Sequence, residues 1–178
     1  LLDRPVEPDQ DRWFGYKVRP FGTVYVAAEG QEDFEVRLHA WRMARGLPAD
    51  VVLPFVLVPT SVDLRSNDAD TERLINEIRH FSADMEHRCG VKCESVVIDT
   101  VSRALAGGNE NASDDMGAFV LNCGKIKQAV GTALVGVHHG GKEGGRGPRG
   151  SEVLHGATDS EFEVAGATDT EANSFTVR

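Results

Sequence analysis

Apolar and β-branched residues are concentrated in short segments of the chain, and longer segments of mixed character separate them. The strand-like segments lie at residues 23–30, 54–60, 95–99 and 132–137. Two shorter runs near the end, EFEVAG and NSFTVR, predict a C-terminal β-hairpin. Strands that alternate with helices need crossover connections. The pattern therefore predicts an α/β fold with a mainly parallel sheet and helices on both faces.

Three amphipathic helices are predicted from apolar residues that recur every three or four positions. These residues are Phe34, Leu38 and Trp41 in the first helix, Leu74, Ile78, Phe81 and Met85 in the second, and Met116, Phe119, Val120, Cys123 and Ile126 in the third. Gly46 and Gly90 are expected to stop the first two helices. Ser113 is the predicted N-cap of the third, whose first turn holds two aspartates.

Composition and charge limit the class of protein. A chain of 178 residues favours one domain, spanning residues 1–178. Its longest apolar run is far shorter than the roughly 20 residues that span a bilayer, which argues against a membrane protein. Three cysteines, an odd number, favour the reducing cytoplasm over a disulfide scaffold. The net charge of -9 argues against a broadly basic nucleic-acid surface, although a local basic loop could bind phosphates.

Polar side chains follow three of the predicted strands. They are Glu29, Asp99, and the pair His138 and His139. A single residue of this kind is more often a helix cap or a solvated loop residue. Parallel strands, however, bring their carboxyl ends together, so three such ends favour a functional site. The set suits metal-assisted phosphoryl transfer. Asp99 could hold Mg²⁺, Glu29 could orient or deprotonate a water, and a histidine could sense the terminal phosphate.

Two glycine-rich segments match phosphate-binding patterns by letter only. GVHHGGK, at residues 136–142, fits G-x-x-x-x-G-K, but Glu143 follows where a Ser or Thr would bind Mg²⁺, and no helix is predicted after it. GRGPRG, at 145–150, fits G-x-G-x-x-G but lies inside a long loop. We interpret both matches as by-products of abundant glycine.

Four segments, taken in order, resemble the RecA-like ATPase core of the AAA-type family that includes plasmid RepA replicative helicases and phage DNA-repair ATPases. They are VYVAAEG, VVIDTVSRALAGGNENASDDMGAF, VGVHHGGK and RGPRGSEVLHGATDSEFEV, and the likeness covers most of residues 13–165. The resemblance implies a RecA-like fold, ATP and Mg²⁺ as ligands, and homo-oligomers, which are hexamers in the family. Single-stranded DNA is a candidate partner.

The resemblance also implies residue roles in the nucleotide site. VVIDT resembles the Walker B strand, which makes Asp99 the magnesium-associated acid. Glu29 resembles the glutamate that polarises the hydrolytic water, and His138 and His139 occupy the sensor position.

Basic residues have implied roles as well. Lys142 and Arg149 resemble residues that reach into a neighbouring subunit's nucleotide. The loops at 103–111 and 142–149 are candidates for the nucleic-acid path, through Arg103, Lys142, Arg146 and Arg149.

The resemblance leaves one element of the family unmatched. In family members the Walker A strand and loop precede WFGYKVRPFGTVYVAAEG, whereas twelve residues precede Trp13 here and none forms G-x-x-x-x-G-K-[ST]. We therefore expect a core without its first strand, through truncation or loss from the gene. Two function classes follow. One is a helicase or DNA-repair ATPase core that is inactive alone, and the other is a non-catalytic assembly or nucleic-acid-binding module. Because the Walker A strand lies beside 132–137 in this fold, an exposed apolar edge is expected there.

Overall fold

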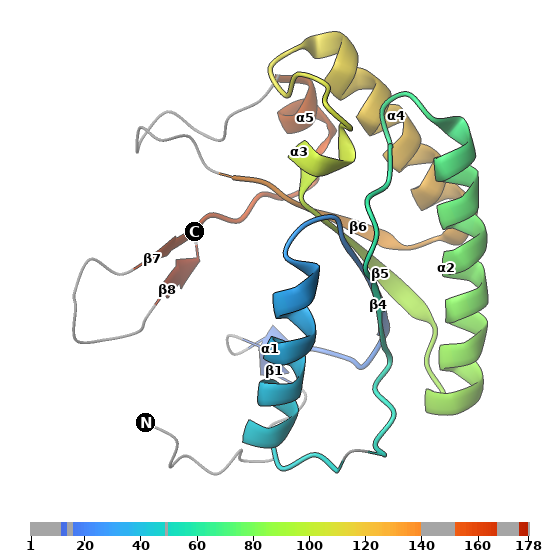
Figure 1. The fold of residues 1–178 in the computed structure, drawn as a ribbon, viewed down its shortest axis with the longest axis vertical. Coiled ribbons are helices and arrows are strands. Elements are labelled where there is room, and N and C mark those ends of the chain that lie inside the picture. Colours follow the sequence, from blue (N-terminus) through green and yellow to red (C-terminus); the bar gives the residue numbers. More distant parts are fainter. Residues whose placement is uncertain (1–11, 14–15, 49, 140–151, 167–174, 178) are drawn as a thin grey trace.

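Four parallel strands form the central sheet of the protein (Figure 1). The computed structural model describes residues 12–13, 16–48, 50–139, 152–166 and 175–177. The sheet strands are β3 (Gly22–Ala27), β4 (Phe55–Val58), β5 (Cys93–Asp99) and β6 (Ala133–Val137). They lie side by side in the order β4-β3-β5-β6. The predicted parallel α/β sheet is confirmed.

Helices flank this sheet on both faces. They are α1 (Gln31–Ala44), α2 (Asp68–Cys89), α3 (Val101–Ala104), α4 (Ser113–Val130) and α5 (Glu152–Ala157). The long helices α2 and α4 lie side by side and contact strands of the sheet, while α1 lies apart from them (Figure 1). Asn67 caps α2 by accepting hydrogen bonds from two backbone N–H groups, and Gly90 ends it in the left-handed conformation. The predicted stop at Gly90 is confirmed.

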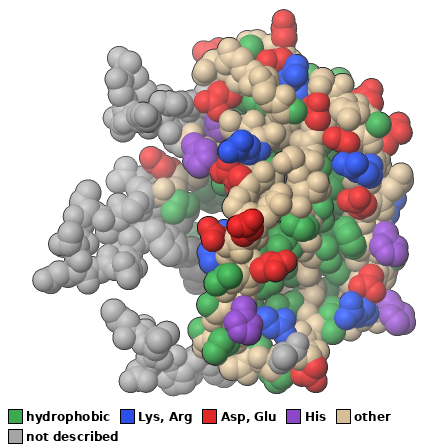
Figure 2. All heavy atoms as spheres, viewed as in Figure 1, with side chains coloured by type: hydrophobic (Ala, Val, Ile, Leu, Met, Phe, Trp, Pro, Cys, Tyr) green, Lys and Arg blue, Asp and Glu red, His purple; other side chains and the backbone are tan. Residues whose placement is uncertain are grey.

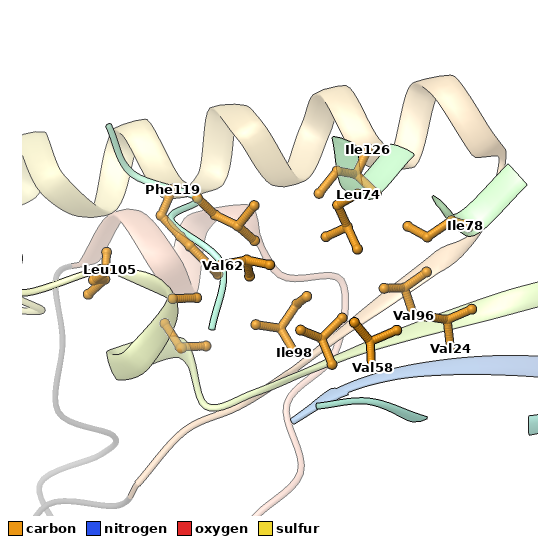
Figure 3. Close-up of a cluster of buried hydrophobic side chains, with 14 of the residues drawn as sticks. Val24, Val58, Val62, Leu74, Ile78, Val96, Ile98, Leu105, Phe119 and Ile126 are labelled. Atoms are coloured by element: carbon orange, nitrogen blue, oxygen red, sulfur yellow. The ribbon is translucent and has the colours of Figure 1, made fainter. Parts of the chain in front are cut away.

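The hydrophobic core lies between one face of the sheet and the two long helices (Figure 3). Its buried side chains include Val24, Val26, Val96 and Ile98 from the strands, Leu74, Ile78 and Met85 from α2, and Met116, Phe119 and Ile126 from α4. Each of them stabilises the fold by about 1.5–3 kcal/mol relative to an exposed position. Successive strand residues point to opposite faces, so the residue after Ile98 points away from this core. That residue is Asp99.

Helix α4 differs from the prediction in two details. It begins at Ser113 with Ala112 in the N-cap position, so Ser113 is not the cap. Val120 and Cys123 are only half-buried, and the buried position between them belongs to Asn122. The side-chain amide of Asn122 donates a hydrogen bond to the backbone oxygen of Leu64 at 3.0 Å. This bond replaces one to water for the amide nitrogen, whereas the side-chain oxygen of Asn122 is buried without a hydrogen-bond partner in the described part of the chain.

The opposite face of the sheet packs against α1 through aromatic rings. The Phe34 ring lies 4.8 Å from that of Tyr25 and 5.9 Å from that of Phe55, measured between centroids. Leu38, one helical turn further along α1, is half-buried as well. Trp41, predicted on the same helical face, is 42% exposed and does not share in the burial of that face. Trp41 lies on the same side of α1 as Phe34, two turns further along, where the Arg45 guanidinium covers its ring at 5.4 Å from the centroid.

Strand β6 is an edge strand of the sheet. Its continuous apolar sequence is typical of a buried strand, yet Val135 is 47% exposed and Val137 is 37% exposed. Among the described strands it pairs with β5 alone. An exposed apolar edge is therefore present at the position where the sequence led us to expect one.

Two short antiparallel pairs complete the described structure. β1 (Arg12–Trp13) pairs with β2 (Tyr16–Lys17), and β7 (Val164–Gly166) pairs with β8 (Phe175–Val177). The second pair confirms the predicted C-terminal hairpin. In the described part of the chain, no helix has both the length and the apolar character that crossing a membrane requires.

Candidate functional site

The carboxyl ends of three sheet strands meet at one edge. The register pairs Ala27 of β3 with Asp99 of β5, and Asp99 with Val137 of β6. The backbone N–H of Ala28 also donates to the backbone oxygen of Asp99 at 2.6 Å. The polar residues that follow these strands are therefore brought to the same edge, as the sequence pattern predicted.

Glu29 lies between two nitrogen-bearing side chains from other elements. Its Oε2 accepts a hydrogen bond from Arg103 Nε at 2.9 Å, and its Oε1 lies 3.4 Å from His139 Nε2. The hydrogen bond from Arg103 is the main reason why the pKa of Glu29 lies below its ordinary value. Glu29 is therefore ionised near neutral pH. The structure thus brings together the predicted Glu29, Arg103 and His139.

Arg103 reaches Glu29 because of the short turn that follows β5. Thr100 is buried, and its hydroxyl accepts a hydrogen bond from the backbone N–H of Arg103 at 3.4 Å. This contact caps the start of α3. Since Thr100 directly follows Asp99, the same turn fixes the candidate magnesium-associated acid and Arg103 relative to each other.

Asp99 is half-buried and has a partner that the sequence reasoning missed. The Tyr25 hydroxyl donates a hydrogen bond to Asp99 Oδ2. Burial, followed by this hydrogen bond, raises the pKa of Tyr25, so the hydroxyl remains protonated and available as a donor. A signal was present in the sequence: Tyr25 interrupts an apolar run two residues before Ala27, and in a strand that spacing places it on the same face as Ala27 and Asp99.

The described residues include both histidines but not the basic loop. His139 is exposed and faces Glu29, whereas His138 is half-buried. Lys142, Arg146 and Arg149 lie outside the described residues.

An open pocket of about 530 Å³ lies beside Arg103. Its lining includes Ser61, Asp63, Ser102, Arg103 and Gly107. The pocket is formed where the loop after β4 meets α3, next to the carboxyl ends of the sheet strands.

The loop after α3 is fastened to the body of the protein. Arg65 Nε donates to the backbone oxygen of Leu105 at 2.9 Å, and its Nη1 lies 3.3 Å from Asp115 Oδ1. The other oxygen of Asp115 accepts the backbone N–H of Asn109 at 2.7 Å. This part of the candidate nucleic-acid loop is thus held at both ends by charge-assisted hydrogen bonds.

Charge is mixed over the visible surface of the protein. Figure 2 shows acidic and basic side chains interspersed on this face, without one continuous basic patch. This distribution agrees with the net charge of -9. On this face, a phosphate contact would therefore depend on single basic residues more than on a broad positive field.

Comparison with known proteins identifies the family. A family model described as an AAA domain matches residues 9–145, which is more than half of the chain. The match includes β3, β5 and β6, and with them Glu29, Asp99 and His139. No curated protein and no solved structure gives a match. The chain belongs to this family of AAA domains.

Proposed function

We propose that this AAA domain is the nucleotide-binding core of an ATPase, with Mg²⁺·ATP bound at the carboxyl ends of β3, β5 and β6. The observation that carries the proposal is the convergence of Glu29, Asp99 and His139 on that edge of the sheet. Open parallel sheets bind ligands at this edge in general. The test is to locate bound nucleotide on the protein by NMR, with Mn²⁺·ATP as the probe, because that method also detects weak binding.

The residues at the edge fit magnesium bound together with phosphate. Mg²⁺ usually keeps several waters and binds through one or two carboxylates and the phosphates of its substrate. Asp99 offers one half-buried carboxylate, which Tyr25 orients. No group of three or more His, Cys, Asp and Glu side chains suited to a metal occurs in the described ranges. When bound, Mg²⁺ would neutralise charge on the phosphates.

Glu29 and His139 have complementary roles in this proposal. An ionised carboxylate can accept a proton from, or orient, an attacking water, which is the role proposed for Glu29. His139 touches the other oxygen of the same carboxylate, at 3.4 Å, and could report a change at the terminal phosphate to β6. His138, directly after β6, is the second candidate for this sensor.

The finer assignment is a helicase or DNA-repair ATPase. We propose single-stranded DNA as its partner, with Arg103 and Arg146 on the nucleic-acid path. Lys142 and Arg149 are proposed to act on that path or in the nucleotide site of a neighbouring subunit. We place the protein in the cytoplasm, since Cys89, Cys93 and Cys123 are all free thiols.

A second candidate function is a non-catalytic assembly or nucleic-acid-binding module. The observation that favours it is that none of the 178 residues forms G-x-x-x-x-G-K-[ST]. In P-loop enzymes the backbone N–H groups and the lysine of that motif hold the triphosphate. One result distinguishes the two candidate functions. The non-catalytic module would bind no Mg²⁺·ATP at Asp99 and the carboxyl ends of the strands, although it would still bind a partner.

Self-association is expected through the exposed edge of β6 or through the β7–β8 hairpin. An edge strand presents unpaired N–H and C=O groups to other chains, and β6 adds the exposed side chains of Val135 and Val137. Light scattering over a wide concentration range should show dimers or larger species. Val135→Lys should shift that equilibrium towards the monomer, while Leu121→Lys, at an exposed position on α4, should leave it unchanged. A protein that stays monomeric at every concentration would contradict this expectation.

A further inference from the structure

Arg103 occupies an unusual position between two candidate sites. Its Nε is bonded to Glu29 on one side, while its residue lines the open pocket beside α3 on the other. Glu29 is the candidate for orienting the attacking water, and Arg103 is a candidate for contacting nucleic acid. The ion pair therefore joins two groups that, in the proposed function, have separate tasks.

The ion pair between Arg103 and Glu29 is weak enough for another anion to replace Glu29. Arg103 is 65% exposed and the Glu29 side chain is 34% exposed, so solvent reaches both charges. An ion pair of this kind is worth only about 0.2–1 kcal/mol, which a stronger partner for the guanidinium can exceed. A phosphate group is such a partner, because the planar guanidinium can bind two of its oxygens at once.

The residues around Arg103 would keep it beside the pocket after a phosphate replaced Glu29. Its backbone N–H is bonded to the buried Thr100, and the loop that follows is fastened through Arg65 and Asp115. The hydroxyl residues Ser61 and Ser102 line the same pocket. The acidic residues there are already engaged: Asp63 accepts from Ser66, and Asp70 pairs with Arg73 at 3.1 Å.

We infer that Arg103 binds phosphate, and that in the free protein its guanidinium is instead paired with Glu29. Phosphate binding at α3 therefore breaks the ion pair and releases Glu29. The phosphate can come from a polynucleotide backbone or from a nucleoside triphosphate, since the chemistry of recognition is shared. The role of the released Glu29 rests on the proposed function, but the competition for Arg103 does not. Binding and release are linked, so removing the ion pair must strengthen phosphate binding by the factor by which the pair had weakened it.

The test is a double-mutant cycle that measures binding alone. The full chain is titrated into a labelled oligothymidylate at low salt, about 50 mM, where phosphate contacts are strongest. Glu29→Gln should tighten binding about two- to fivefold, as expected for loss of an exposed ion pair. Arg103→Ala should weaken binding and lower the salt dependence by roughly one phosphate contact. In the Arg103→Ala background, Glu29→Gln should change the affinity less than about 1.5-fold.

Two controls make the result specific. Glu110→Gln removes one negative charge from the nearby loop, and in the described structure no ion pair involves Glu110, so it measures the effect of net charge alone. A parallel titration with Mg²⁺·ATP distinguishes the two sources of phosphate. The double-mutant cycle shows coupling between Glu29 and Arg103 only with the probe whose phosphate replaces Glu29 on Arg103. The inference is overturned if Glu29→Gln has the same effect with and without Arg103 for both probes, or if neither probe binds any of the variants. Mn²⁺·ATP that binds away from the carboxyl ends of β3, β5 and β6 would contradict the proposed function and leave this result standing.

Discussion

Replacing Ile98 by alanine should lower the free energy of unfolding by about 2–5 kcal/mol, the usual cost of truncating a buried isoleucine to alanine. Ile98 is fully buried in the core between the sheet and the helices α2 and α4 (Figure 3). It also directly precedes Asp99, so the substitution loosens the strand that carries the candidate magnesium-associated acid. Denaturant unfolding followed by circular dichroism measures the change.

Leu121→Ala is the matched control for this result. Leu121 lies on α4 and is 63% exposed, so its truncation should change the stability by no more than about 0.5 kcal/mol. Equal losses from the two substitutions would mean that Ile98 is not a core residue, and the packing of β5 against α2 and α4 would then be wrong.

Mg²⁺·ATP should bind the isolated 178-residue chain weakly, with a dissociation constant above about 1 mM, and phosphate release should be negligible. Asp99 and Glu29 can stabilise charge and position water, but neither holds the triphosphate. Backbone N–H groups and the lysine of a P-loop normally do so, each charge-assisted hydrogen bond contributing about 1.5–3 kcal/mol. None of the 178 residues forms that motif. Titration calorimetry and a phosphate-release assay measure the two quantities.

One outcome would contradict this expectation clearly. Micromolar binding with turnover that Asp99→Ala abolishes would show that the triphosphate is held after all. GVHHGGK, at residues 136–142, or an element of a partner chain would then supply the missing donors. Asp84→Ala, at an exposed position on α2, controls for a general effect of removing an acidic residue.

The sheet and its candidate site could be predicted from sequence because their signals are local. Continuous β-branched runs mark β3 and β5, and the repeat of Leu74 and Ile78 marks the buried face of α2. The position of Asp99 after the run VVI was the signal for a site at the strand end, and in the structure the strand period turns Asp99 away from the core that Ile98 joins. Parallel pairing then places it level with the ends of the neighbouring strands.

The partners of the site residues could not be predicted, because they depend on contacts distant in sequence. Tyr25 reaches Asp99 across 74 positions, and Arg103 reaches Glu29 across 74. No periodic pattern encodes either contact. Asn122 was missed for a related reason: its amide nitrogen donates to a distant backbone oxygen, whereas a hydrophobic pattern assigns polar residues to the surface.

The measurement that tests the central claim most directly locates bound nucleotide on the protein. Mn²⁺·ATP added to ¹⁵N-labelled protein broadens the amide signals of residues near the metal, even when binding is weak. Broadening should centre on residues 27–30, 99–103 and 137–139, the carboxyl ends of β3, β5 and β6, and it should largely disappear in Asp99→Asn. Broadening centred elsewhere, such as the pocket between α2 and α4 that Ser82 and Thr132 line, would contradict the claim that this edge of the sheet is the nucleotide site. Broadening that persists unchanged in Asp99→Asn would contradict it equally.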